Sequence, residues 1–112
     1  MKLTCEDHDQ LAIIKIQGEL VGDHADELFK EIQERLNRQV RDFVFDLSDM
    51  DFIDSHGLEV ILDVQEQTAE QLGQVRLAAL AGNINEILRI TRLASRIECH
   101  ETVEGAIKSL RI

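Results

Sequence analysis

The sequence predicts an α/β domain with a mixed, mostly parallel sheet of four to five strands and about four helices. Short apolar runs alternate along the chain with longer stretches whose apolar residues recur every three to four positions. Strands that alternate with helices form parallel sheets, because right-handed helical crossovers join them. The first two strand-like runs instead follow one another directly, as in a hairpin. The expected order is therefore β-β-α-β-α-β-α-β-α.

The N-terminal half supplies the hairpin and the first crossover. KLTCED at residues 2–7 and LAIIKIQG at 11–18 predict two strands, with a turn at residues 7–10. A helix follows, because apolar residues spaced at i, i+3, i+4, i+7 and i+11 form one helical face. These residues are Ala25, Leu28, Phe29, Ile32 and Leu36. FVFDL at residues 43–47 is too short for a helix and is typical of a strand covered on both faces.

The C-terminal half continues the alternation. The second helix is expected to face the core with Leu58, Ile61, Leu62, Ala69 and Leu72. Val60 and Val64 lie roughly 200–240° around from Leu58 at 100° per residue. They either pack on a neighbouring helix or form an apolar docking patch. GQVRLAALAG at residues 73–82 predicts a strand between two glycines, and RIECH at 96–100 predicts another. Helices are expected around residues 84–91 and 103–110.

Length and charge restrict the classes of function. The 112 residues suit a single domain over residues 1–112. The net charge of −10, from 22 acids and 12 bases, disfavours nucleic-acid partners and anionic membranes. No run of 18 apolar residues and no signal-peptide pattern is found, so we expect a cytoplasmic protein without direct membrane insertion.

The stretch MDFIDSHGLEV at residues 50–60 carries the most specific chemistry. A nucleophile elbow needs Gly-x-Ser-x-Gly, but Ile53 stands where the first glycine should be. The acids around it match no calcium-loop pattern, and the chain has no His-x-x-x-His pair and no phosphate-binding loop. We therefore expect no catalytic residue, no metal site and no cofactor, and a protein that is not an enzyme.

Two interpretations of Ser55 remain. It could be a helix N-cap, because a side-chain oxygen there accepts a bond from a free backbone N–H. A cap leaves Gly57 unexplained, since glycine costs about 1 kcal/mol relative to alanine inside a helix; an opening for a partner's approach would explain it. Alternatively, Ser55 could be phosphorylated. A helix N-terminus tolerates a phosphate, whose charge of about −2 beside Asp54 would repel a docked partner without unfolding the domain.

Three segments carry a resemblance to a known family. GEL at residues 18–20, FVFDLSDMDFIDSHGLEVIL at 43–62 and ETVEGAI at 101–107 resemble STAS domains, and more narrowly the bacterial anti-sigma factor antagonists. The resemblance covers essentially the whole chain, and its most specific motif is at residues 53–58. It implies the STAS fold. It also implies phosphorylation of Ser55 by a histidine-kinase-like serine kinase that is itself the anti-sigma factor, and reversal by a PP2C-type phosphatase.

The sequence departs from the family pattern twice. His56 stands where serine or threonine is usual, and Val21 replaces an acid that often follows GEL, with Asp23 two places on. The residues expected to bind the partner are Asp54, Ser55, His56, Gly57, Glu59, Val60, Asp23 and His24. The resemblance implies a partner-switching module whose unphosphorylated form binds the anti-sigma factor and frees a sigma factor. The alternative is a constitutive STAS scaffold or transport-accessory protein without a phosphoswitch, because fold does not fix function.

Overall fold

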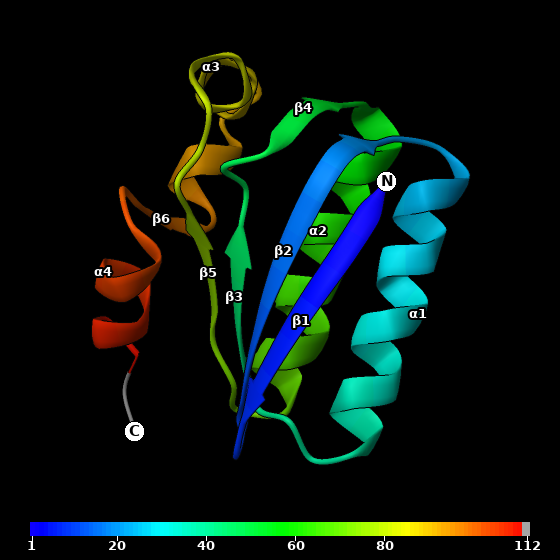
Figure 1. The fold of residues 1–112 in the computed structure, drawn as a ribbon, viewed down its shortest axis with the longest axis vertical. Coiled ribbons are helices and arrows are strands. Elements are labelled where there is room, and N and C mark those ends of the chain that lie inside the picture. The colour runs from blue at the N-terminus through cyan, green and yellow to red at the C-terminus, as the bar shows by residue number, and fades with distance from the viewer. Residues whose placement is uncertain (111–112) are drawn as a thin grey trace.

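The computed structural model describes residues 1–110, which form one sheet with helices on both of its faces (Figure 1). The strands are β1 (Lys2–His8), β2 (Leu11–Leu20), β3 (Asp42–Asp46), β4 (Met50–Ile53), β5 (Val75–Ala78) and β6 (Glu98–His100). The helices are α1 (Asp23–Asn37), α2 (Ser55–Glu70), α3 (Gly82–Ile90) and α4 (Val103–Lys108), with a short 3-10 turn at Leu93–Ser95.

The sheet runs in the order β1-β2-β3-β5-β6, and β4 pairs with β2. Strands β1 and β2 form an antiparallel hairpin, and the other pairings are parallel. The prediction of a mixed, mostly parallel α/β sheet is confirmed. The predicted strand number was too low, because β4 was not counted as a separate strand. Strand β2 is long enough to pair with β3 along its first half and with β4 at its end.

The two faces of the sheet differ in how they are covered. Helices α1 and α2 lie side by side on one face, over the larger core, whose fully buried side chains include Ile14, Phe43 and Leu77. Helix α4 lies on the other face, over a small cluster of Val44, Ala78 and Ala106. The consecutive β3 residues Phe43 and Val44 are both fully buried, as expected for a strand covered on both faces.

Helix α2 faces the core with a different stripe from the one predicted. Its buried residues are Gly57, Val60, Ile61, Val64 and Thr68. Val60 and Val64 are 4% and 1% exposed and belong to the main core. The two valines thus lie on the face that α2 buries in the main core. The docking patch is wrong, and Val60 does not present its side chain to a partner. Leu72, predicted to face the core, is 87% exposed beyond the helix end.

Candidate functional site

The predicted site lies where two connections meet, one from β2 to α1 and the other from β4 to α2. The backbone N–H of Asp54 donates to the carbonyl oxygen of Leu20 at 3.4 Å. The N–H of Gly22 donates to Asp54 Oδ2 at 3.1 Å. Gly22 has a φ of 47°, a left-handed conformation that glycine adopts without steric strain. One aspartate thus joins the start of α1 to the start of α2.

Asp54, and not Ser55, is the N-cap of α2. Its backbone is extended, and its Oδ1 accepts a hydrogen bond from Gly57 N–H at 2.8 Å. This bond, followed by the one from Gly22, holds the pKa of the Asp54 carboxyl below its ordinary value. Because Asp54 satisfies the free N–H of the first turn, the interpretation of Ser55 as the cap is wrong.

Gly57 is required by packing inside the domain. A Cβ atom at this position would lie 2.3 Å from the carbonyl oxygen of Leu20 and 2.8 Å from Cγ1 of Ile53. The first turn of α2 can approach the end of β2 only because residue 57 has no side chain. The expectation that the backbone stays open here for a partner is therefore wrong, and Gly57 lies buried.

Ser55 is exposed as the first residue of α2. Its hydroxyl makes no hydrogen bond to any other group within residues 1–110. The side chain is therefore held at a rigid helix start without contributing to the hydrogen bonds that build it. A group with this placement is accessible to a modifying enzyme and dispensable for the fold.

His56 links the two helix starts on the surface. Its Nε2 lies 2.7 Å from Asp26 Oδ1 on α1, and its Nδ1 lies 3.7 Å from Glu59 Oε2 on α2. The hydrogen bond with Asp26 is the main cause that raises the pKa of His56 above its ordinary value. Sequence reasoning missed Asp26, because it lies on the exposed side of a helix far from Ser55 in the sequence.

The remaining predicted residues border the same corner. Asp23 is exposed as the first residue of α1, directly after the Gly22 that bonds to Asp54. His24 Nδ1 lies 3.2 Å from the carbonyl oxygen of Glu19. The structure thus brings the predicted residues of α1 and α2 to one edge of the domain. Val60 and Gly57 are exceptions, because both are buried and offer no surface at this edge.

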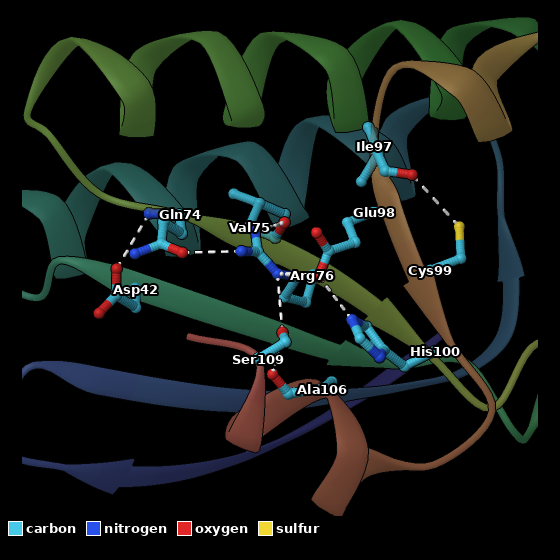
Figure 2. Close-up of polar contacts among 10 residues, drawn as sticks. All are labelled: Asp42, Gln74, Val75, Arg76, Ile97, Glu98, Cys99, His100, Ala106 and Ser109. Atoms are coloured by element: carbon cyan, nitrogen blue, oxygen red, sulfur yellow. Dashed lines mark hydrogen bonds and ion pairs between the residues drawn. The ribbon is translucent and has the colours of Figure 1, made fainter. Parts of the chain in front are cut away.

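A second polar cluster lies between α4 and strands β5 and β6 (Figure 2). Arg76 Nε donates to Ser109 Oγ at 2.9 Å and lies 2.8 Å from Glu98 Oε2, which also contacts His100 Nε2 at 2.6 Å. The hydrogen bond with His100 is the main cause that lowers the pKa of Glu98. The Ser109 hydroxyl donates to the carbonyl oxygen of Ala106 at 2.6 Å. These groups satisfy one another, so the cluster holds the end of α4 on the sheet.

Within residues 1–110, no group of three or more His, Cys, Asp or Glu side chains is arranged to hold a metal ion. No helix in this part of the chain combines the length and the apolar character that crossing a membrane requires.

Comparison with known proteins identifies the family. The sequence model of the STAS domain matches residues 2–106. The chain belongs to the STAS domain family. It is 29% identical over 111 residues to BtrV of Bordetella bronchiseptica, which is named as an anti-sigma factor antagonist. The alignment covers 99% of this chain and 96% of BtrV. The resemblance inferred from the sequence is confirmed.

Solved structures share the STAS fold along nearly the whole chain. An anti-sigma factor antagonist of Thermotoga maritima superposes with a TM-score of 0.91 at 22% identity, covering 98% of this chain and 95% of the other. SpoIIAA of Bacillus in its phosphorylated form superposes with a TM-score of 0.75 at 17% identity, covering 96% and 97%. At these identities the likeness concerns the fold alone.

Proposed function

We propose that this STAS domain is an anti-sigma factor antagonist switched by phosphorylation of Ser55. Its unphosphorylated form binds an anti-sigma factor that is also a histidine-kinase-like serine kinase, and thereby frees a sigma factor. The kinase transfers a phosphate to Ser55, and a PP2C-type phosphatase removes it. The domain acts in the cytoplasm as a binding module, without catalysis, cofactor or nucleic-acid partner of its own.

The observation that carries this proposal is that Asp54 makes the structural hydrogen bonds of this corner and Ser55 makes none of them. Asp54 makes the cap and the tie to Gly22, so the fold does not need the Ser55 hydroxyl. Ser55 itself is exposed and free to be modified. A scaffold that used Ser55 as an ordinary cap would show the opposite arrangement. The name of the relative BtrV, an anti-sigma factor antagonist, supports the antagonist part of the proposal.

A phosphate on Ser55 would be tolerated by the fold and felt by a partner. It would sit at the N-terminus of a helix of 16 residues, where the helix dipole favours negative charge. SpoIIAA superposes on this chain with a TM-score of 0.75 in both its unphosphorylated and its phosphorylated form, so the STAS fold accommodates a phosphorylated state. Beside Asp54 and Glu59, the added charge of about −2 makes desolvation of this corner unfavourable.

The partner surface we propose consists of the exposed starts of α1 and α2. It includes Asp23, His24, Ser55, His56 and Glu59, which border one edge of the domain. A partner that covers Ser55 must desolvate this edge, and a phosphate without a basic counterpart would raise that cost by several kcal/mol. We expect the affinity to fall on the order of 100-fold on phosphorylation, since each 1.4 kcal/mol is tenfold.

The site is tested by incubating the protein with the candidate kinase and ATP and measuring intact mass. We expect one phosphate on the wild type and on Ser48→Ala, an exposed serine in the loop before β4, and none on Ser55→Ala. The thermal stability of Ser55→Ala should equal that of the wild type, because the hydroxyl bonds to nothing else within residues 1–110. Undiminished labelling of Ser55→Ala would contradict the proposed site.

The switch is tested by titrating the kinase with both forms of the protein in a calorimeter, with circular dichroism of each form. Weaker binding with an unchanged spectrum is expected. Equal affinities would favour a constitutive STAS scaffold or transport-accessory protein. Weaker binding with a collapsed spectrum would mean that the phosphate acts by unfolding the domain.

A further inference from the structure

Strand β4 exposes a phenylalanine three residues before Ser55. Phe52 is 46% exposed, whereas Phe43 and Phe45 in the neighbouring β3 are 0% and 1% exposed. A large exposed aromatic side chain on a rigid strand loses little conformational freedom when it is buried by a partner, which is why such residues are common anchors of interfaces.

A bulge is the reason that Phe52 points outward. Gly18 pairs with Met50, but the next β2 residue, Glu19, pairs with Phe52, so Asp51 is an extra residue in β4. The normal alternation of a strand is thereby broken, and Asp51 and Phe52 are both exposed in succession. Bulges of this kind re-aim side chains and are frequent beside functional sites.

The bulge is held in place from both sides. Gly18 has a φ of 91° and donates its N–H to the carbonyl oxygen of Asp49 at 3.0 Å. Asn83, at the start of α3, donates from Nδ2 to the carbonyl oxygen of Asp51 at 2.7 Å. The outward position of Phe52 is therefore a fixed feature of the fold and not the free end of a loop.

The two chain segments that form the corner beside Phe52 are acidic, and on α3, which packs against β4, Glu86 and Arg89 pair with each other. Residues 17–29 contain four acidic side chains and residues 47–63 contain five, and neither segment contains a lysine or an arginine. The two segments are joined by the bond between Gly22 and Asp54. Lys15 lies 3.0 Å from Asp49 and neutralises that carboxylate, but Glu19 and Asp51, which flank Phe52 by register and by sequence, are exposed.

We propose that Phe52 is an anchor of the partner interface, and that the anti-sigma partner receives it in an apolar pocket whose lysine or arginine side chains face Glu19 and Asp51 and not Ser55. This inference rests on the proposed function and names the chemistry of its partner surface. Acidic groups around an apolar anchor select a basic surface, because like charges brought together at an interface are strongly unfavourable. A second copy of this corner is excluded as the occupant on the same ground, since it would place carboxylates against carboxylates.

The test compares Phe52→Ala with Leu72→Ala in calorimetric titrations of the unphosphorylated protein with the anti-sigma kinase. Leu72 is a matched control, because it is 87% exposed and lies beyond the far end of α2, about 24 Å from Ser55 at 1.5 Å per residue. We expect Phe52→Ala to weaken binding on the order of 30-fold, the size of an interface hot spot. Leu72→Ala should change it less than about twofold.

A second variant tests the charge, and it guards against a fold defect in Phe52→Ala. Asp51→Lys should weaken binding about tenfold at low salt, and the difference should shrink at high salt. Thermal melts of both variants check that the fold is kept. Wild-type affinity of both variants, with binding still lost on phosphorylation of Ser55, would overturn the inference and leave the proposed function standing. Absence of any binding between the wild type and the kinase would overturn both.

Discussion

The N-termini of α2 and α4 are capped in the same way. In each, a side-chain oxygen of the residue before the helix accepts a hydrogen bond from the N–H of a glycine three residues on. Asp54 accepts from Gly57 at 2.8 Å, and Thr102 accepts from Gly105 at 2.9 Å. Both segments therefore follow one local pattern, in which a capping oxygen satisfies a free N–H of the first turn.

The surroundings of the two caps differ. Asp54 uses its second oxygen to hold Gly22 and so ties two connections together, whereas Thr102 has a single oxygen. A Cβ at Gly57 would collide with backbone, but one at Gly105 would meet the Thr102 hydroxyl at 3.1 Å. The first helical residue is an exposed serine in α2 and the half-buried Val103 in α4. A cap pattern alone thus does not identify a functional helix start; its attachment to the rest of the domain does.

The largest contrast between the two helix starts is expected from their glycines. Gly57→Ala should lower the free energy of unfolding by about 3 kcal/mol or more, because its Cβ would lie 2.3 Å from the Leu20 carbonyl oxygen and neither backbone can yield easily. Gly105→Ala should stay within about 1 kcal/mol of the wild type, since alanine favours the helix and only a side chain has to move. Urea unfolding followed by circular dichroism measures both.

Equal effects of the two substitutions would contradict the close contact between α2 and β2. A Gly57→Ala protein as stable as the wild type would also restore the interpretation that this glycine serves a partner. Phosphorylation of that variant by the kinase would then have to be compared with the wild type.

A smaller contrast is expected from the caps. Thr102→Ala should reduce the free energy of unfolding by about 1 kcal/mol, the usual effect of losing a cap. Asp54→Ala should reduce it further, because it also releases Gly22. The pKa of Asp54 is lowered in the folded state by the Gly57 and Gly22 N–H groups. Its contribution is therefore present above the unfolded value of about 3.9 and is lost as the pH falls through the folded pKa.

Because the pKa of Asp54 is lowered in the folded state, the two caps should respond differently to pH. The difference in unfolding midpoint between the wild type and Asp54→Ala should shrink in acid, whereas the difference for Thr102→Ala should not, since threonine does not titrate in this range. Urea titrations at pH 7 and in the range around pH 3–4 decide it. A pH-independent effect of Asp54→Ala would show that the carboxylate charge does not stabilise the cap.

The fold could be predicted from the sequence because most elements carry a clear period. The alternation of strands and helices and the hairpin were correct. Strand β4 could not be predicted as a separate strand, because the bulge exposes Asp51 and Phe52 in succession and erases the two-residue alternation. The core face of α2 was displaced because Gly57 and Thr68 are part of it, and no apolar pattern assigns them there.

The candidate site was located by its motif, but the roles within it were not. The sequence places Asp54, Ser55 and Gly57 together, yet the partners that define their roles, Leu20 and Gly22, come from another strand and loop. Local spacing therefore suggested Ser55 as the cap, whereas Asp54 is the cap. It also attributed Gly57 to a partner when the end of β2 is the cause.

The smallest expected effect concerns the second residue of each helix, His56 in α2 and Glu104 in α4. His56 bridges to Asp26 of α1, and this contact raises its pKa. A group whose folded pKa is raised stabilises the fold fully below its unfolded value of about 6.5, and the contribution is lost as the pH rises through the folded pKa. His56→Gln should therefore lower Tm relative to the wild type at pH 6 by about 1–2 °C, since exposed pairs are weak. At pH 9 the difference should vanish.

Two comparisons isolate the His56–Asp26 contact as the cause. Asp26→Asn should remove the same pH-dependent increment, and combining it with His56→Gln should add nothing further, because the two side chains act as a pair. Glu104→Gln, at the equivalent position of α4, should give the same change in Tm at both pH values. Calorimetric melts at pH 6 and pH 9 in low salt compare the wild type with all four variants. A His56→Gln effect that persists at pH 9, or that adds fully to Asp26→Asn, would mean that the ring stabilises the start of α2 by packing. The difference between the two helix starts would then come from the packing of the side chain at the second position and not from its ionic contact.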